Sequence, residues 1–498
     1  MWYFLIEHLR TAFRWFLSFF IFIEEYSQPS CGKIYRCYNF WPFGSVPQML
    51  LYEYFNLTKS DPGIDILAWH RFLAKRYGVA IIHSPVAIGI NFVAVYNPAD
   101  IRHVLKNNEN NYERNLFFPA VKRLLGSGIS ATNGHEWIVQ RKTALSVVSP
   151  KLIQESEPVF RVESLNLIDR MTGTFDFQRL IAVYTIIVFS RHAFNYRGNW
   201  ENMETFAQAF SQVADIVAEM NQRSIVNPLW LMYYACCTPS KFDRAYDRLM
   251  SMLKSFLSQV NSNDTDHYSI LAKYKDKNEY NESQIADIML NLLIAGRDTL
   301  AYTLTATIYL LARHPEVETR LVDEIYSSFD NSNNINMKIT DKMPYLSNII
   351  SEVLRLYPSV GLDIRMAKHG DVLPSNGYHV RPKDVVVVSS FGTHRSEMYW
   401  GKDSEVFNPD RWGKGRPPNV QPEGVDEGAY FPFHYGSHQC VGMRLSYAEL
   451  KYTLVMLYYH LHFDLVDPGP HQVEHKLTGS FIDGLMVSST ARNRDSNQ

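Results

Sequence analysis

The sequence predicts a mainly α-helical fold with small β-sheets, and three observations support this prediction. Helical spacing of apolar residues dominates from residue 134 to residue 329. The longest helical run covers residues 283–313, and at about 1.5 Å per residue it would span roughly 45 Å, enough to cross a whole domain. Short apolar segments bounded by turn residues are typical of strands, and they lie at residues 79–83, 92–96, 367–390 and 477–487.

The composition excludes several classes of protein. The 498-residue chain carries 49 basic and 51 acidic side chains, so no excess of positive charge favours binding to nucleic acid. Its five cysteines, an odd number that includes the adjacent pair Cys236 and Cys237, have neither a disulfide pattern nor zinc-ligand spacing. This cysteine usage favours a reducing compartment.

Residues 1–28 are predicted to attach the protein to a membrane. The segment is aromatic and aliphatic, but charged side chains interrupt it, and only residues 15–23 form a nearly clean apolar run. That run is shorter than the about 20 residues that span a bilayer. The alternatives are a transmembrane helix with its charges near the interface, an amphipathic helix lying in the interface, or a helix docked on the protein itself.

A hinge is predicted over residues 29–47, where Pro29, Pro42 and Pro47 stand among glycines and serines. No comparable break follows, so residues 48–498 are predicted to form one large domain. Within it, Asn97 and Pro98 indicate a helix that runs to about residue 107. Residues 108–133 lack a regular pattern, and a loop of that length is usually functional.

Trp137 and Arg141 are four residues apart and therefore share one face of a predicted helix. An indole N–H and a guanidinium are both hydrogen-bond donors and suit an anionic group. The alternative is a surface arginine that stacks on a tryptophan.

The middle of the long helix contains Gly296, Asp298 and Thr299, and Ser283 can cap its start. A glycine inside a helix costs about 1 kcal/mol relative to alanine, so the motif predicts a local opening of the helix. A carboxylate and a hydroxyl beside such an opening can relay protons. The alternative is that the Thr299 hydroxyl bonds to its own helix.

Glu352 and Arg355 are spaced to meet on one helix face. Apolar flanks predict that the pair is buried, and a buried pair needs a further partner, which Arg411 offers. Arg365 is a second candidate donor to an anionic group.

One cysteine stands in a glycine-framed loop. Phe433, Gly436, Cys440 and Gly442 describe a tight turn that presents one thiolate and leads into a helix over residues 443–459. A helix N-terminus stabilises a thiolate through its dipole and its free N–H groups. Ligation of haem iron matches this chemistry. The alternative is an inert buried cysteine beside a glycine turn.

Taken together, these motifs resemble those of the membrane-bound, microsomal type of the cytochrome P450 family, from residue 41 to about residue 487. The resemblance implies the P450 fold and haem b, with Cys440 as the axial ligand of the iron and with Asp298 and Thr299 as an acid–alcohol pair that relays protons to dioxygen chemistry. It implies a structural triad of Glu352, Arg355 and Arg411. It places the other haem-binding residues at Trp137, Arg141, Arg365, Phe433, Gly436, His438 and Gly442. His438 departs from the arginine that is usual in microsomal members.

The implied function is a haem-dependent monooxygenase that inserts one oxygen atom from dioxygen into a C–H bond. The motif at residues 295–299 is similar to that of fungal and plant fatty-acid and alkane hydroxylases, which predicts hydroxylation of a lipophilic chain at or near its end. Electrons would come from NADPH through the NADPH–cytochrome P450 reductase, with cytochrome b5 as a second candidate partner. The predicted location is the endoplasmic reticulum membrane, with the catalytic domain on the cytosolic face.

Three alternatives remain open: a monooxygenase of a terpenoid or polyketide pathway, a haem-binding sensor or electron carrier, and an isomerase-type relative that uses peroxide. Asp298 and Thr299 disfavour the last two. The predicted substrate-pocket residues are apolar or aromatic: Tyr112, Phe117, Phe118, Leu125, Met289, Leu292, Leu293, Val360 and Leu362.

Overall fold

The structure is a computed structural model. It describes residues 66–75, 77–83, 91–114, 119–146, 148–196, 198–226, 240–259, 270, 274, 280–413, 416 and 419–492, together with the short strands β1 (Glu25–Tyr26) and β2 (Ile34–Arg36). Apart from these two strands, the predicted membrane segment and hinge lie outside the described residues.

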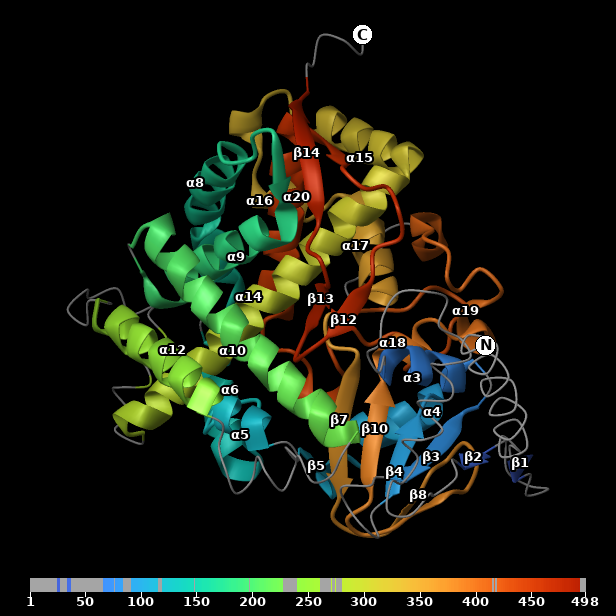
Figure 1. Ribbon diagram of the computed structural model, residues 1–498. Coiled ribbons are helices and arrows are strands. Elements are labelled where there is room, and N and C mark those ends of the chain that lie inside the picture. Colours follow the sequence, from blue (N-terminus) through green and yellow to red (C-terminus); the bar gives the residue numbers. More distant parts are fainter. Residues whose placement is uncertain are drawn as a thin grey trace, which may run out of the picture.

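The fold is mainly α-helical, as predicted, and its helices surround the long central helix α14 (Glu282–Arg313) (Figure 1). The other helices are α3 (Ile66–Ala74), α4 (Pro98–Arg102), α5 (Pro119–Leu125), α6 (Gly134–Leu145), α7 (Pro150–Glu155), α8 (Glu157–Ile168), α9 (Phe177–Phe194), α10 (Trp200–Val226), α12 (Ser240–Gln259), α15 (Pro315–Ser328), α16 (Met337–Thr340), α17 (Pro344–Leu356), α18 (Ser390–Thr393), α19 (Glu397–Trp400) and α20 (Met443–His460).

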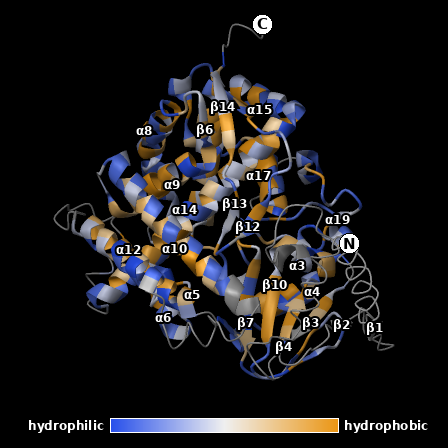
Figure 2. Ribbon diagram, viewed as in Figure 1, coloured by the Kyte–Doolittle hydropathy of each residue, from blue (hydrophilic) through white to orange (hydrophobic). Residues whose placement is uncertain are grey.

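Four small sheets complete the described fold, and the largest has the strand order β1-β2-β3-β4-β10-β7-β5. Its interior strand β10 is parallel to β4 and antiparallel to β7. Neighbours cover both faces of β10, which explains its unbroken run of apolar residues (Figure 2). The strands are β3 (Val79–His83), β4 (Asn91–Val95), β5 (Tyr112–Arg114), β6 (Thr174–Asp176), β7 (Leu362–Ala367), β8 (Asp371–Val372), β9 (His379–Val380), β10 (Val385–Ser389), β11 (Leu461–Leu465), β12 (Val473–His475), β13 (Gly479–Phe481) and β14 (Met486–Ala491).

The central helix α14 differs from its prediction in two respects. Its cap is Asn281 rather than Ser283, in a capping box with Gln284. The predicted opening at Gly296 is wrong, since α14 is continuous from Glu282 to Arg313. An added Cβ at Gly296 would collide with the ring of Phe189 on α9. Close packing of two helices therefore accounts for this glycine.

Two further sequence predictions were incomplete. The expected loop over residues 108–133 contains β5 and the helix α5, which is too short for its periodicity to stand out. The strand β11 begins directly after α20, with no turn residue to mark the change. Among the described residues, no helix is both long enough and apolar enough to span a membrane.

Candidate active site

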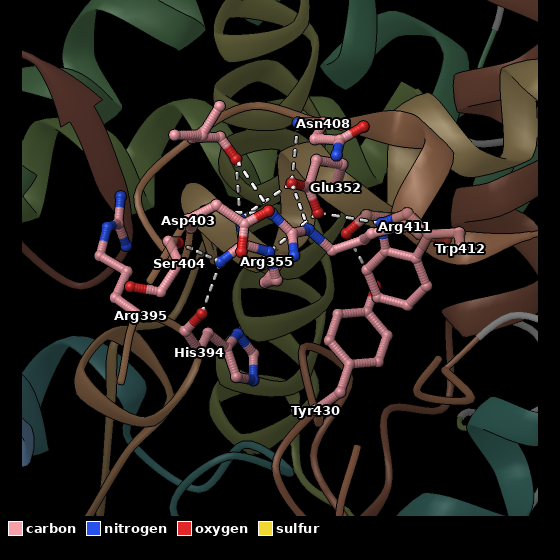
Figure 3. A network of polar contacts seen from close by, with 12 residues as sticks. Glu352, Arg355, His394, Arg395, Asp403, Ser404, Asn408, Arg411, Trp412 and Tyr430 are labelled. Carbon is pink, nitrogen blue, oxygen red and sulfur yellow. Dashed lines mark hydrogen bonds and ion pairs between the residues drawn. The ribbon is translucent and has the colours of Figure 1, made fainter. Parts of the chain in front are cut away.

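A buried ionic network is centred on Glu352 and Arg355 of α17 (Figure 3). Arg355 meets both carboxylate oxygens of Glu352, with Nε–Oε2 and Nη2–Oε1 distances of 2.8 Å, and both side chains are fully buried. Arg411 donates from Nε to Glu352 Oε1 at 3.0 Å, and the indole N–H of Trp412 donates to Oε2 at 2.9 Å. The predicted triad is confirmed, with Trp412 as an additional partner.

This network also fixes the chain that leads toward the cysteine loop. Arg355 donates from Nη1 to the carbonyl oxygen of His394 at 2.8 Å and from Nη2 to that of Val406 at 3.2 Å. His394 in turn accepts the backbone N–H of Phe431 at its Nε2, at 3.0 Å. His394 therefore connects the triad to the start of the loop, with its carbonyl oxygen bonded to Arg355 and its ring bonded to Phe431.

The loop itself closes through a hydrogen bond from the Cys440 N–H to the carbonyl oxygen of Phe433, at 2.8 Å. Gly436 has a φ of 69°, and a Cβ there would collide with the carbonyl oxygen of Leu105. The close neighbour of Gly436 is the backbone of the π-helix His103–Asn107, so this glycine lets the loop pack against that helix.

Cys440 is exposed and lines a large cavity. Desolvation by the surrounding protein raises the pKa of its thiol. The backbone N–H groups of Gly442 and Met443 and the charge of Arg141 act in the opposite direction. Gly442 is the N-cap of α20, so these donors belong to the helix N-terminus that the sequence predicted. These three groups stabilise the anionic form of the thiol and oppose the effect of desolvation.

The cavity has a volume of about 1130 Å³ and a mostly apolar wall. Among the predicted haem-binding residues, those on its wall are Trp137, Arg141, Phe433, His438, Cys440 and Gly442. Four predicted pocket residues also line it: Leu125, Leu292, Val360 and Leu362.

The other pocket predictions were not met within the described residues. Met289 and Leu293 are buried in the hydrophobic core, and neither lines the cavity. Tyr112 turns away because its hydroxyl donates to Asp371 Oδ2 at 2.6 Å. Phe117 and Phe118 lie outside the described residues.

Donors gather on one side of the cavity. The ring of His438 stacks on that of Trp137, with 4.0 Å between centroids, and the Arg141 guanidinium lies 5.5 Å from the Trp137 ring centroid. The Nδ1 atom of His438 is buried and has no hydrogen-bond partner within the described part of the chain. Burial, with help from nearby arginines, lowers the pKa of His438 to about 3. A neutral His438 therefore has one ring nitrogen free for a ligand.

Sequence reasoning missed Arg114, which lies opposite Arg365 in the antiparallel register of β5 and β7. Like charges in such a position repel each other. Burial and the charge of Arg365 lower the pKa of Arg114 to about 10. The nearest compensation is Asp363, whose Oδ2 lies 2.7 Å from Arg365 Nε and 2.8 Å from His434 Nε2. An anionic ligand here would offset the excess of positive charge, and a single sequence offers no signal for this cross-strand pair.

Asp298 and Thr299 face different surroundings. The Thr299 hydroxyl lines the cavity and donates to the carbonyl oxygen of Ala295 at 2.7 Å, which is the alternative that the sequence left open. Asp298 does not line the cavity and instead pairs with Arg297 at 2.6 Å. Burial raises the pKa of Asp298, and Arg297 opposes this shift. The structure therefore brings only the hydroxyl to the cavity wall.

A thiol at a helix N-terminus, a cavity above it and surplus guanidinium groups beside it suit a thiolate-bound haem with two anionic propionates, so the residues fit this cofactor. The fold and the site define a haem-thiolate protein. The family model of cytochrome P450 matches residues 68–483, and the chain belongs to this family. It is accordingly a monooxygenase, an oxidoreductase that acts with haem.

Several known cytochrome P450 proteins are similar to this chain at modest sequence identity. Cytochrome P450 94A1 of Vicia sativa is 27% identical over 73% of this chain and 74% of its own length. Cytochrome P450 704C1 of Pinus taeda is 26% identical over 85% of this chain and 89% of its own length. Cytochrome P450 52A12 of Debaryomyces hansenii is 26% identical over 74% of this chain and 76% of its own length.

Proposed function

We propose that this P450 hydroxylates a medium or long aliphatic chain at or near its end. The observation that carries this proposal is the apolar wall of the cavity around Thr299, which includes Leu292, Leu300, Val360 and Leu362. Each buried methylene of a substrate contributes about 0.8 kcal/mol, so a chain gains affinity as it fills such a slot. The similarity of residues 295–299 to the motif of fatty-acid and alkane hydroxylases supports the same substrate class.

In this proposal Cys440 would bind the iron of haem b, and Trp137, Arg141, Arg365 and His438 would hold its propionates. Phe433, Gly436 and Gly442 shape the loop around the thiolate. Arg114 joins the propionate donors because of its place beside Arg365. The bound haem supplies the activation of dioxygen and the oxidation of the C–H bond.

The residues of the chain supply orientation and protons. Thr299 is proposed to hold a proton at its Oγ1 atom on the cavity wall. Asp298 is proposed to act as the proton source behind it, which requires a change in its pairing with Arg297. The apolar wall positions the substrate and excludes water from the site.

Electrons are proposed to arrive from the NADPH–cytochrome P450 reductase, with cytochrome b5 as a second donor. The proposed location is the endoplasmic reticulum membrane, with residues 1–28 as the anchor and the catalytic domain on the cytosolic face. The aromatic and aliphatic composition of that segment supports this proposal.

A chain-length series tests the substrate. The haem-loaded full chain would be titrated with fatty acids, alkanes and compact polycyclic compounds, and products would be assigned by mass spectrometry. Affinity should rise by up to roughly fourfold per added methylene and then level off, and oxidation should fall near the methyl end. Binding and turnover of only the polycyclic compounds would overturn the proposal and favour a terpenoid or polyketide pathway.

A further inference from the structure

A buried arginine that is not part of the cysteine loop lies on the cavity wall. Arg395 follows α18, lines the cavity and is only 6% exposed. Its Nη1 atom is buried without a hydrogen-bond partner among the described residues. Figure 3 shows its guanidinium directed away from Glu352 and Arg355, so it does not belong to the triad. A buried guanidinium with a free donor is costly unless a ligand or a carboxylate completes it.

The charges around Arg395 leave this site positive. Glu405 is its ion-pair partner, with Oε2 3.4 Å from the Arg395 Nε. The same carboxylate also serves Arg71, whose Nε lies 2.7 Å from Oε1, and Lys75 at 3.8 Å. Lys75 has a second partner in Glu397 at 3.6 Å. Three cations thus share two carboxylates, and two of the cations, Arg71 and Arg395, line the cavity.

Besides the arginines near the cysteine loop, a further charged group on the cavity wall has more carboxylates than cations. Lys476, beside the β12–β13 hairpin, lies 2.6 Å from Asp215 on α10 and 2.7 Å from Glu474. One ammonium therefore has two carboxylate partners. An anionic ligand is repelled by this pair of carboxylates, whereas Arg395 and Arg71 attract it.

A continuous stretch of cavity wall joins Thr299 to Arg395. Ser359 donates to the carbonyl oxygen of Thr299 at 3.0 Å, and Ser390 donates to that of Val360 at 2.7 Å. The guanidinium carbon of Arg395 lies 3.9 Å from the ring centroid of Phe391. All of these residues line the cavity, so an extended chain can lie against them from the reacting region to the guanidinium.

We propose that Arg395, with Arg71 beside it, binds the carboxylate of the substrate, so that this enzyme acts on fatty acids rather than on alkanes. The proposal rests on the aliphatic function proposed above. A planar guanidinium can donate two parallel hydrogen bonds to a carboxylate, and burial strengthens such a pair. A fixed carboxylate also holds the chain at one depth, which limits oxidation to a narrow set of carbons.

The first test uses the unaltered, haem-loaded full chain. A fatty acid, its methyl ester and the alcohol and alkane of equal chain length are compared by titration calorimetry. Hydrogen bonds to charged groups predict that the acid binds about 10-fold to 100-fold more tightly than the ester or the alcohol. Equal affinities for all four would overturn the carboxylate site and leave the aliphatic function standing. Failure of all four to bind would refute the aliphatic function itself.

The second test uses matched variants. Arg71→Leu removes an exposed cation, and Arg395→Lys keeps the charge but removes the planar fork. Both should weaken binding of the acid about 10-fold, leave binding of the ester within about twofold, and widen the spread of oxidised carbons. Arg320→Leu, which removes an exposed cation paired with Asp410, is the control and should change neither.

Lys476→Gln separates the two charged places. If the acid lost affinity in this variant and kept it in Arg71→Leu, the carboxylate would lie at the hairpin and the proposal would be wrong. The melting temperature shows whether Arg395→Lys folds. If it does not fold, Arg71→Leu and the comparison of acid, ester, alcohol and alkane still test whether the carboxylate binds at this site.

Discussion

At the scale of single residues, the site contains buried polar atoms whose hydrogen bonding is incomplete. His438 Nδ1 and Arg395 Nη1 are buried without a hydrogen-bond partner among the described residues, and both belong to the wall of one cavity. Unpaired buried donors and acceptors are costly in a folded protein, and they mark places where a ligand completes the hydrogen bonding.

Thr299 is the residue on which we expect proton delivery to depend. Thr299→Ala should leave haem and substrate binding nearly unchanged, because among the described residues its hydroxyl bonds only to its own helix. Product formed per NADPH should fall about 10-fold or more, with hydrogen peroxide released instead. The control is Thr307→Ala, which removes a similar hydroxyl bond to the helix at a fully buried position. Unchanged coupling in Thr299→Ala would mean that the hydroxyl is structural.

Glu449 gives a prediction about pH. It is fully buried on α20, and neither carboxyl oxygen has a partner within the described chain. Burial raises the pKa of this carboxyl well above 4.5, so the folded state keeps a proton that the unfolded state releases. Ionisation of the unfolded state then costs stability as the pH rises above about 4.5.

Glu449→Gln should remove this loss, so its melting temperature relative to the unaltered protein should rise between about pH 5 and about pH 8. Glu423→Gln, at a side chain that is 94% exposed, should show no such trend. Parallel pH profiles for the unaltered protein and Glu449→Gln would contradict the prediction.

At the scale of elements, helix packing and a buried ionic network hold the site in place. α14 crosses the domain and meets α9 closely at Gly296, while α17 carries the acidic centre of the triad. The spacing of residues along the sequence predicted both helices. It did not predict the residues that pack against them, because these come from distant segments.

Gly296→Ala separates helix propensity from packing. Alanine favours the helix by about 1 kcal/mol, but its Cβ would collide with the Phe189 ring, and overpacking costs about 1–3 kcal/mol. We expect a net loss of up to about 2 kcal/mol, measured as a lower melting temperature. The double variant Gly296→Ala with Phe189→Leu should recover the loss. A more stable single variant would show that propensity dominates.

Glu352→Gln tests the triad. The change leaves the cations Arg355 and Arg411 without their shared carboxylate, which predicts a loss of about 3–5 kcal/mol or a failure to fold. The exposed pair of Arg320 and Asp410 provides the contrast, since Asp410→Asn should cost less than about 1 kcal/mol. Thermal unfolding of both variants measures the difference. Similar losses would mean that burial adds little to the pair.

At the scale of the whole molecule, the described residues form the P450 fold, and the proposed attachment to a membrane is a prediction from residues 1–28. We expect the full chain to sediment with membranes and to resist release by high salt, because burial of apolar surface does not depend on ionic strength. Deletion of residues 1–28 should weaken this attachment. Recovery of the intact chain in the supernatant, with no detergent present, would refute the predicted anchor.

The sequence by itself determined the fold class, the long central helix, the cysteine loop and the acidic pair partner of Arg355, because each depends on spacing along a short segment. Only the tertiary structure decided that Asp298 pairs with Arg297 behind the cavity wall, that Gly296 makes room for Phe189, and that Arg114 and Arg395 bring unbalanced charge to the cavity. Apart from the adjacent pair Arg297 and Asp298, these features join segments that are distant in the sequence. Their contacts follow from strand register and helix packing, which no local pattern in a single sequence records.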